Sequence, residues 1–252
     1  MKLAHEFIKL PFLFDIDQMK KEIDTFIADD WIPHHQGFKG NYSIPLISVN
    51  GQSNNLFKGP MKSTSELDKL PYIKQVIASF GEVCGRSRLM MLDGKAEVPL
   101  HCDINNYWYS RVRVHIPITT NEDVIFHCGD KQVHMAAGES WIFDSWKNHT
   151  VVNSSSKQRV HLVIDFSGSA SFWDTVKQSQ VPWVNKNSIE DHYLAYTENK
   201  TTNIKTENYN VSQVMVPGEL SYLIAELLNE VRGVKENDVD TINQFSVVLE
   251  QF

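Results

Sequence analysis

The chain has 252 residues, of which 42% are hydrophobic and 22% are charged, and this composition indicates a globular protein instead of a disordered or fibrous one. Its 24 Lys and Arg residues against 31 Asp and Glu residues give a net charge of −7. Because no basic cluster is long enough to follow a phosphate backbone, nucleic acid is not an expected partner.

Targeting and redox signals are also absent from the sequence. Charges interrupt the amino terminus before an apolar run reaches the length of a signal peptide, and no window reaches the roughly 18 apolar residues of a membrane span. The three cysteines, Cys84, Cys102 and Cys128, are an odd number without CxxC spacing, which indicates neither a disulfide framework nor a zinc ribbon. We therefore expect a soluble, cytoplasmic protein with no membrane partner.

The first two thirds of the chain pass from helical to strand patterns. Apolar residues at helical spacing predict helices within residues 16–28 and 65–80, and Pro71 predicts a break inside the second pattern. From residue 86 to 166, short runs of Val, Ile, Leu and aromatic residues are separated by turn signals. This stretch predicts about eight strands.

Helical patterns return towards the carboxy terminus, at residues 172–178, 219–231 and 239–249. Residues 183–213 are polar with little periodicity and predict a long irregular connection. We expect a β domain with amino-terminal helices over residues 1–168 and a helical region over residues 169–252.

The most distinctive motif is His101-Cys102-Asp103, followed 46 residues after Asp103 by His149. Side chains at positions i and i+2 of a strand point to the same side, so His101 and Asp103 can converge on one point. Two imidazole nitrogens and one carboxylate oxygen can hold Fe(II) on one face of its octahedron, which leaves three positions open for a chelating cosubstrate and O2. We predict that His101, Asp103 and His149 are metal ligands and the catalytic centre.

Two of the predicted strands carry an apolar face opposite a polar one. Arg111, Arg113 and His115 alternate with valines and an isoleucine, and Arg159 shares a face with His161 and Asp165 in the last strand. Antiparallel strands usually wet their polar face, which would leave these arginines in solvent. A small barrel or jelly roll can instead enclose polar groups around a ligand, and the metal motif favours this alternative.

An enclosed polar face provides groups for a dianionic cosubstrate. Arg159 is suited to a carboxylate because its planar guanidinium can form two parallel hydrogen bonds. Arg113 and His115 can donate further hydrogen bonds to the same anion. We predict that these three residues bind the cosubstrate.

Residues near the motif are candidates for the substrate pocket. Asn105 and Trp108 follow it directly, and Arg88 could hold an anionic group of the substrate. Packing for Trp108 and solvent exposure for Arg88 are the competing interpretations.

The ordered motifs resemble the aspartyl/asparaginyl β-hydroxylase family of Fe(II)/2-oxoglutarate oxygenases, particularly its small bacterial members. The resemblance covers about a third of the chain and includes the motifs Arg88-Leu89-Met90, Pro99-Leu100-His101-Cys102-Asp103, Arg113-Val114-His115-Ile116-Pro117, Gly138-Glu139-Ser140-Trp141, His149-Thr150-Val151-Val152-Asn153 and Arg159-Val160-His161-Leu162-Val163-Ile164-Asp165. It implies a mainly β fold with flanking helices and a double-stranded β-helix core, which is a cupin-like jelly roll. It also implies that His101 and His149 bind iron and that Arg159 binds the C5 carboxylate of 2-oxoglutarate.

Asp103 directs the expected substrate within that family. The animal peptide hydroxylases carry Gly at this position, whereas members that act on free proline have the HxD motif. The resemblance therefore implies an Fe(II)/2-oxoglutarate-dependent dioxygenase that hydroxylates a small polar substrate, such as a free or carrier-linked amino acid, and releases succinate and CO2. The alternatives are a hydroxylase of peptidyl Asp, Asn or other protein side chains, and a non-catalytic cupin-like metal-binding module.

The region beyond residue 168 lies outside the resemblance. Because a helical part also follows the core of the proline hydroxylases, we expect a cap or a homodimer surface there.

Overall fold

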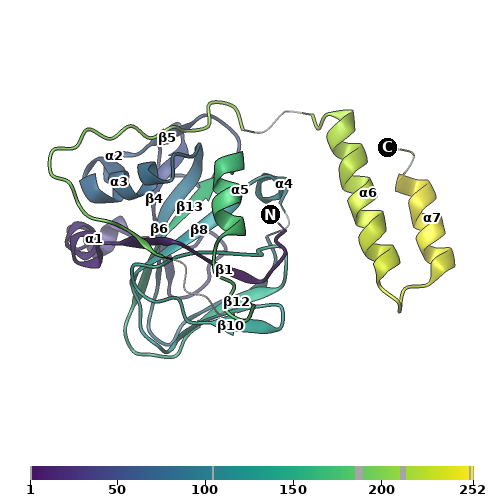
Figure 1. The fold of residues 1–252 in the computed structure, drawn as a ribbon, viewed down its shortest axis with the longest axis horizontal. Coiled ribbons are helices and arrows are strands. Elements are labelled where there is room, and N and C mark those ends of the chain that lie inside the picture. The colour runs from purple at the N-terminus through teal and green to yellow at the C-terminus, as the bar shows by residue number, and fades with distance from the viewer. Residues whose placement is uncertain (1, 104, 185–189, 211–213, 250, 252) are drawn as a thin grey trace. The chain divides into compact units, whose positions relative to one another are not determined.

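The computed structural model describes residues 2–103, 105–184, 190–210, 214–249 and 251 (Figure 1). The chain divides into two compact units, Met1–Asn210 and Val211–Phe252. This boundary lies after the division expected at residue 168. The reason is that the intervening segment packs on the first unit: α5 (Ala170–Lys177) contacts β1 (Phe7–Leu10), and β14 (His192–Leu194) pairs in parallel with β2 (Phe12–Phe14).

Eight strands between Cys84 and Phe166 are divided equally between two antiparallel sheets. The larger sheet contains β6 (Cys84–Leu92), β8 (Val112–Thr119), β11 (Ser140–Phe143) and β13 (Arg159–Phe166), and the smaller sheet contains β7 (Glu97–His101), β9 (Val124–Cys128), β10 (Lys131–Val133) and β12 (His149–Asn153). Their orders are β11-β8-β13-β6 and β10-β9-β12-β7. This is the arrangement of a jelly roll, and the predicted fold class is confirmed.

Further strands extend the larger sheet at both edges. β1 pairs with β11 on one side, and β4 (Asn41–Val49) pairs with β6 on the other. β3 (Ile32–Pro33) and β5 (Met61–Ser63) both pair with β4. The sequence did not predict these strands. In β4 the reason is visible, because Pro45 interrupts the strand pattern at the point where its register with β6 shifts.

The predicted helices are confirmed. α1 (Ile16–Ile23) contacts β8, and α2 (Ser65–Asp68) contacts β4. α3 (Pro71–Ser79) begins at Pro71, where a missing backbone N–H is tolerated. Short helices lie at η1 (Ala28–Asp30) and α4 (Asn106–Tyr109).

In the second unit, α6 (Pro217–Gly233) and α7 (Val239–Leu249) contact each other. Both helices were predicted from the sequence. In the residues with assigned structure, no helix combines the length and apolar character needed to cross a bilayer. Of the connection expected to be irregular over residues 183–213, residues 185–189 and 211–213 lie outside the described residues.

The inner faces of the two sheets enclose a hydrophobic cluster that includes Phe7, Phe126 and Phe143. The polar face of β8 points into this space, since the His115 ring lies 5.8 Å from the Phe126 ring and 5.1 Å from the Phe143 ring. The opposite face of β8 carries Val114, which is fully buried. The enclosed alternative for the polar faces is therefore the one that the structure supports.

A buried carboxylate joins two helices outside the sheet. Glu22 of α1 accepts hydrogen bonds from the backbone N–H groups of Tyr72 (2.7 Å) and Ile73 (3.0 Å) in the first turn of α3. The residue preceding α3, Leu70, has no side-chain oxygen to cap it. Glu22 therefore replaces the missing cap from 50 residues away.

Replacing Glu22 with Ala should leave both N–H groups buried without an acceptor. We expect the free energy of unfolding to fall by about 1–3 kcal/mol, measured by urea denaturation monitored by circular dichroism. The matched control is Lys21→Ala, at an exposed position of the same helix. Equal stability of the two variants would contradict this cap.

Candidate metal centre and active site

The three predicted ligands converge where β7 and β12 pair. His101 ends β7 and lies opposite His149, which begins β12, and their ring centroids are 4.2 Å apart. Asp103 follows β7, and its backbone N–H is fixed by the Ser145 carbonyl at 2.8 Å. The candidate ligand atoms of the three residues lie within 4.8 Å of one another. The motif and the distant histidine are thus brought together as predicted.

Backbone carbonyls orient both imidazoles. The Nδ1 atom of His101 lies 2.7 Å from the Pro99 carbonyl oxygen, and that of His149 lies 2.9 Å from the Lys147 carbonyl oxygen. When Nδ1 carries the proton and donates, the Nε2 lone pair is left for a metal ion. Burial lowers the pKa of His149 to about 4, and this ring is therefore neutral at pH 7.

Cys102 does not belong to the cluster, although it lies between two candidate ligands in the sequence. Its thiol donates to Asn148 Oδ1 at 2.9 Å. The alternation of an extended segment therefore separates the thiol from the two side chains that converge.

Arg113 positions the carboxylate of the cluster. Its Nη1 lies 3.3 Å from Asp103 Oδ2, and its Nε donates to Asp165 Oδ1 at 2.9 Å. Burial opposes the charge of Arg113, but Asp165 and Asp103 outweigh it and raise the pKa of the guanidinium. Its third nitrogen, Nη2, has no partner among the described residues. Two of the three Arg113 nitrogens are thus occupied by carboxylates, and Nη2 remains for a ligand.

Arg159 lies deeper between the sheets, where the donors exceed the acceptors. It is 4% exposed and lies over the Phe126 ring at 5.1 Å, and its Nε has no partner in the described part of the chain. Burial lowers the pKa of Arg159 to about 9. The same lack of partners holds for both ring nitrogens of His115 and His161. Because buried polar groups are normally paired, these orphaned atoms indicate groups that are available to an anion.

A pocket of about 380 Å³ opens beside the candidate metal ligands. It contains all three predicted substrate residues, Arg88, Asn105 and Trp108. The pocket also includes residues that the sequence did not assign to the site, among them His34, His35, Phe57 and Arg86. Arg86 could have been recognised, because it shares a strand face with Arg88.

Arg86 and Arg88 carry positive charge into this pocket without an acidic partner among the described residues. Both are buried, at 4% and 8% exposure, and both donate to Asn55, Arg86 to its carbonyl oxygen (3.2 Å) and Arg88 to Oδ1 (3.4 Å). Burial and the neighbouring charge of Arg86 lower the pKa of Arg88 well below its usual value. A buried pair of arginines that lacks a carboxylate is suited to an anionic ligand.

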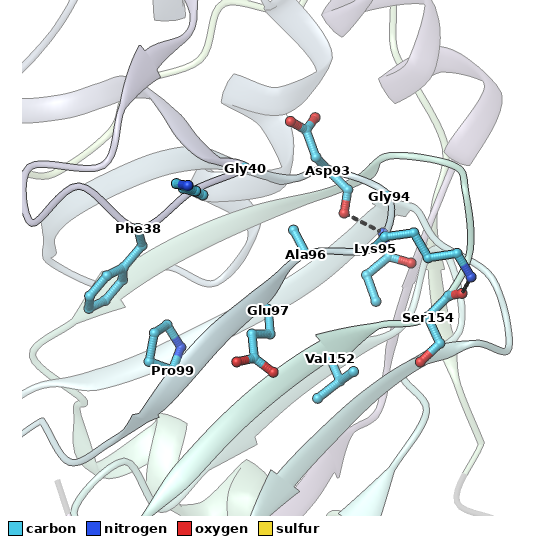
Figure 2. Close-up of a pocket in the computed structure, with 12 residues that line it drawn as sticks. Phe38, Gly40, Asp93, Gly94, Lys95, Ala96, Glu97, Pro99, Val152 and Ser154 are labelled. Atoms are coloured by element: carbon cyan, nitrogen blue, oxygen red, sulfur yellow. Dashed lines mark hydrogen bonds between the residues drawn. The ribbon is translucent and has the colours of Figure 1, made fainter.

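A larger hollow of about 720 Å³ lies elsewhere, along one side of β7 (Figure 2). It is lined by Gly40, Ser154 and a balanced set of two lysines and two acids, Lys39, Lys95, Asp93 and Glu97. The candidate metal ligands do not line it. Its balanced charge also makes it a poor match for an anion.

The sequence match covers this whole site. Residues 17–168, more than half of the chain, match the family model described as aspartyl/asparaginyl beta-hydroxylase. The chain belongs to the aspartyl/asparaginyl β-hydroxylase family. The resemblance found in the motifs is therefore confirmed. The matched region contains His101, Asp103, His149 and Arg159.

A curated relative of this family member is the L-proline cis-4-hydroxylase of Rhizobium meliloti (strain 1021), with 27% identity over 124 residues. The match covers 47% of this chain and 44% of that protein, so the chain matches less than half the length of this relative.

Two solved structures are also similar to the chain. One is an oxidoreductase of the 2OG-Fe(II) oxygenase family from Burkholderia pseudomallei, with a TM-score of 0.46, 14% identity, and coverage of 64% of this chain and 84% of that chain. The other is a Pseudomonas putida prolyl-4-hydroxylase, with a TM-score of 0.43, 12% identity, and coverage of 65% and 92%.

Loss of a candidate ligand should abolish tight metal binding. We expect His149→Ala to weaken binding of Mn(II), a spectroscopic substitute for Fe(II), by more than about 100-fold, because altering a ligand's hydrogen-bond partner alone costs about 10- to 100-fold. Electron paramagnetic resonance titration of free Mn(II) measures this affinity. Cys102→Ser is the matched control and should bind like wild type, and equal affinities of the two variants would contradict the assignment.

The buried histidines should make the metal-free protein sensitive to acid. Burial lowers the pKa of His161 well below its usual value, and the unfolded chain therefore binds a proton that the folded protein does not. The stability from His161 is present above about pH 6.5 and is lost as the pH falls below that value, by about 1.4 kcal/mol per pH unit. Urea denaturation between pH 7.5 and 4.5 should give a shallower slope for His161→Phe than for wild type, whereas parallel curves would refute this linkage.

Proposed function

We propose that the protein is an Fe(II)/2-oxoglutarate-dependent dioxygenase that hydroxylates a small, amino-acid-like substrate. The observation that carries this proposal is the proximity of two anion sites to the His101, Asp103 and His149 cluster. One is the deep site at Arg159, and the other is the pocket with Arg86 and Arg88. A protein that only stores a metal ion needs neither of them.

The donor set of the cluster fits Fe(II). Two imidazoles and one carboxylate match the facial arrangement that leaves further positions for other ligands. Arg113 supports this role, because its Nη1 contacts Asp103 Oδ2 at 3.3 Å while the second oxygen, Oδ1, lies 3.9 Å from His101 Nε2. Hydrogen bonds to ligating groups of this kind fix their orientation.

The Arg159 site fits the far carboxylate of 2-oxoglutarate. Its guanidinium can bind a carboxylate with two hydrogen bonds, His115 and His161 can supply further donors, and the Phe126 ring offers an apolar surface for the methylene groups. The Phe143 ring lies 5.1 Å from the His115 ring and 5.0 Å from the His149 ring, which links this site to the cluster. When bound, iron, 2-oxoglutarate and O2 supply the oxidation, with succinate and CO2 as coproducts.

The substrate pocket supports an amino acid instead of a protein side chain. Arg86 and Arg88 can hold an α-carboxylate, a group that a residue within a peptide chain lacks. Asp103, which gives the HxD motif, and the name of the curated relative, an L-proline hydroxylase, support the same class of substrate. The protein's own contribution is then to hold the substrate by its charged end and keep its C–H bonds close to the metal centre.

The second unit lies outside this proposal for the chemistry. Its exposed apolar side chains, such as Val239 (68% exposed) and Val247 (57% exposed), support the role expected for residues 169–252, a cap or a homodimer surface, for this unit. Homodimer formation and the cytoplasmic location of the protein stay predictions.

Succinate release from 2-oxoglutarate with Fe(II), with each of a panel of free L-amino acids beginning with L-proline, tests the activity. We expect stimulation by at least one amino acid and a new hydroxylated product by mass spectrometry. Arg159→Ala should raise the KM for 2-oxoglutarate by about 100-fold, because two charge-assisted hydrogen bonds are lost.

The matched control for this arginine is Arg232→Ala, at an exposed position of α6. Tight Mn(II) binding without any succinate release would favour the non-catalytic module. Release stimulated by Asp- or Asn-containing peptides alone would favour the peptidyl hydroxylase.

A further inference from the structure

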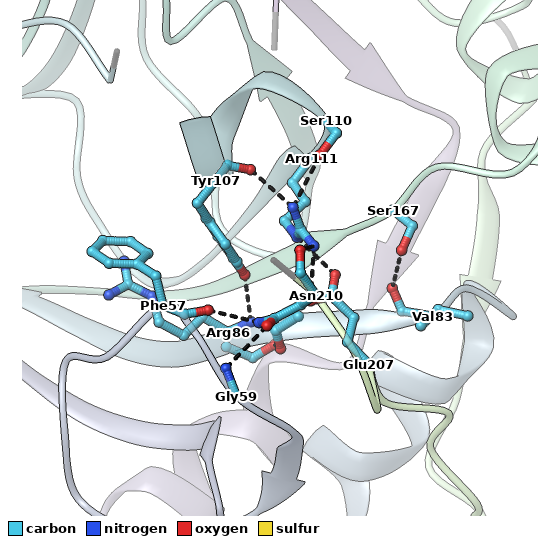
Figure 3. Close-up of polar contacts among 12 residues, drawn as sticks. Phe57, Gly59, Val83, Arg86, Tyr107, Ser110, Arg111, Ser167, Glu207 and Asn210 are labelled. Atoms are coloured by element: carbon cyan, nitrogen blue, oxygen red, sulfur yellow. Dashed lines mark hydrogen bonds and ion pairs between the residues drawn. The ribbon is translucent and has the colours of Figure 1, made fainter. Parts of the chain in front are cut away.

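A segment after the family match contacts a residue that lines the substrate pocket. Residues 205–210, here called the strap, run beside the start of β6 and the start of β5. Figure 3 shows Glu207 and Asn210 of the strap next to Arg111. Cys84 N–H donates to the Lys205 carbonyl (2.8 Å), Glu207 N–H donates to the Cys84 carbonyl (3.0 Å), and Met61 N–H donates to the Glu207 carbonyl (2.7 Å). The strap is therefore attached to both strands by backbone hydrogen bonds.

A buried ion pair fixes the strap to Arg111, the residue directly before β8. Glu207 accepts two hydrogen bonds from Arg111, at 2.8 Å from Nε and 3.1 Å from Nη2, and the two residues are 5% and 8% exposed. Arg111 also donates to the carbonyls of Asn210 (2.9 Å) and Tyr107 (3.2 Å). Arg111 thus serves the strap, although its position in the sequence placed it on the polar wall of the pocket with Arg113.

The end of the strap holds the loop over residues 55–59. The side-chain amide of Asn210 donates from Nδ2 to the Phe57 carbonyl at 2.6 Å, and its Oδ1 accepts from Gly59 N–H at 3.0 Å. One amide therefore pairs with two backbone groups of the loop, as a neighbouring strand would.

The structures held by the strap are those that hold Arg86. The Phe57 ring lies under its guanidinium at 4.0 Å, and Tyr107 Oη accepts a hydrogen bond from its backbone N–H at 2.9 Å. Tyr107 can approach because residue 85 is Gly, where a Cβ would lie 2.4 Å from Tyr107 Oη. Asn55, in the same loop, accepts from both Arg86 and Arg88.

Two buried arginines of like charge need such a support. Repulsion between Arg86 and Arg88 and the loss of hydration both favour rotation of their side chains towards water. The Phe57 ring and the Asn55 oxygens oppose this rotation, and they do so only while the loop stays in place.

We propose that Asn210 and Glu207 are positioning residues that hold the 55–59 loop and Tyr107 and thereby keep Arg86 and Arg88 aimed at the carboxylate of the substrate. This assignment rests on the proposed function for the identity of the ligand. It gives the strap, a segment outside the family match, a part in substrate affinity.

Asn210→Ala tests the proposal at a partly exposed site that should not prevent folding. Hydrogen–deuterium exchange should show faster exchange across residues 55–61, where Gly59 loses its acceptor, and unchanged exchange in β7 and β12. With the amino acid that wild type hydroxylates, L-proline being the first probe, the KM for the amino acid should rise about tenfold. The KM for 2-oxoglutarate and the affinity for Mn(II) should stay within about twofold of wild type.

The matched control is Tyr209→Ala, since this neighbouring side chain in the strap is 76% exposed. It should behave like wild type in both measurements. Glu207→Gln, which keeps the shape and removes the charge, should shift the same KM in the same direction as Asn210→Ala.

Unchanged exchange at residues 55–61 in Asn210→Ala, or equal rises in the KM for the amino acid and for 2-oxoglutarate, would overturn the role of the strap. The exchange measurement does not depend on turnover. If wild type releases no succinate, the proposed function fails, while the exchange result still decides whether the strap holds the loop.

Discussion

Enclosed positive charge is the constraint on which this molecule depends. Arg86, Arg88, Arg113 and Arg159 lie in or beside the space between the two sheets, and in the described part of the chain Asp103 and Asp165 are the carboxylates that contact one of them. Burying a charge without a partner in a protein costs on the order of several kcal/mol. The jelly roll tolerates this excess of positive charge because the arginines lie on or next to strands that are paired on both sides. Helices α1 and α2 pack against the larger sheet. Such a site is stable as a receptor for anions, and its ligands should therefore stabilise the fold.

Arg113 divides that charge into two separate sites. Its two carboxylate contacts offset its charge, so the positive charge without an acidic partner among the described residues lies at Arg159 between the sheets and at Arg86 and Arg88 in the open pocket. Arg113 also makes a cation–π contact with Trp108, 3.8 Å from the ring centroid. A dianionic cosubstrate and an anionic substrate can then bind close to one metal centre without competing for the same cation.

The parts of the site that could be predicted from the sequence follow local rules. Alternation along a strand placed His101 with Asp103, and Arg113 with His115, and the run of short apolar segments gave the eight strands. His149 and Arg159 were selected by their chemistry, because few types of side chain can bind a metal ion or form two hydrogen bonds to a carboxylate. Long-range packing decided the rest. His34 reaches the pocket through the loop before β4, a strand that Pro45 concealed, and Glu22 caps α3 from 50 residues away, where no local pattern signals it.

The distribution of roles along the chain has a physical reason. His101, His149 and Arg159 lie on strands of the jelly roll and Asp103 directly follows one, so ladder hydrogen bonds of the sheets fix their positions. The residues that hold Arg86 and Arg88, namely Asn55, Phe57, Glu207 and Asn210, come from irregular segments that tolerate changes in sequence and length. Chemistry that is common to a family needs the rigid part, whereas recognition of a particular substrate needs the variable part. A strap that begins 37 residues after the end of the family match, at Lys205, can therefore tune the pocket without disturbing the metal centre.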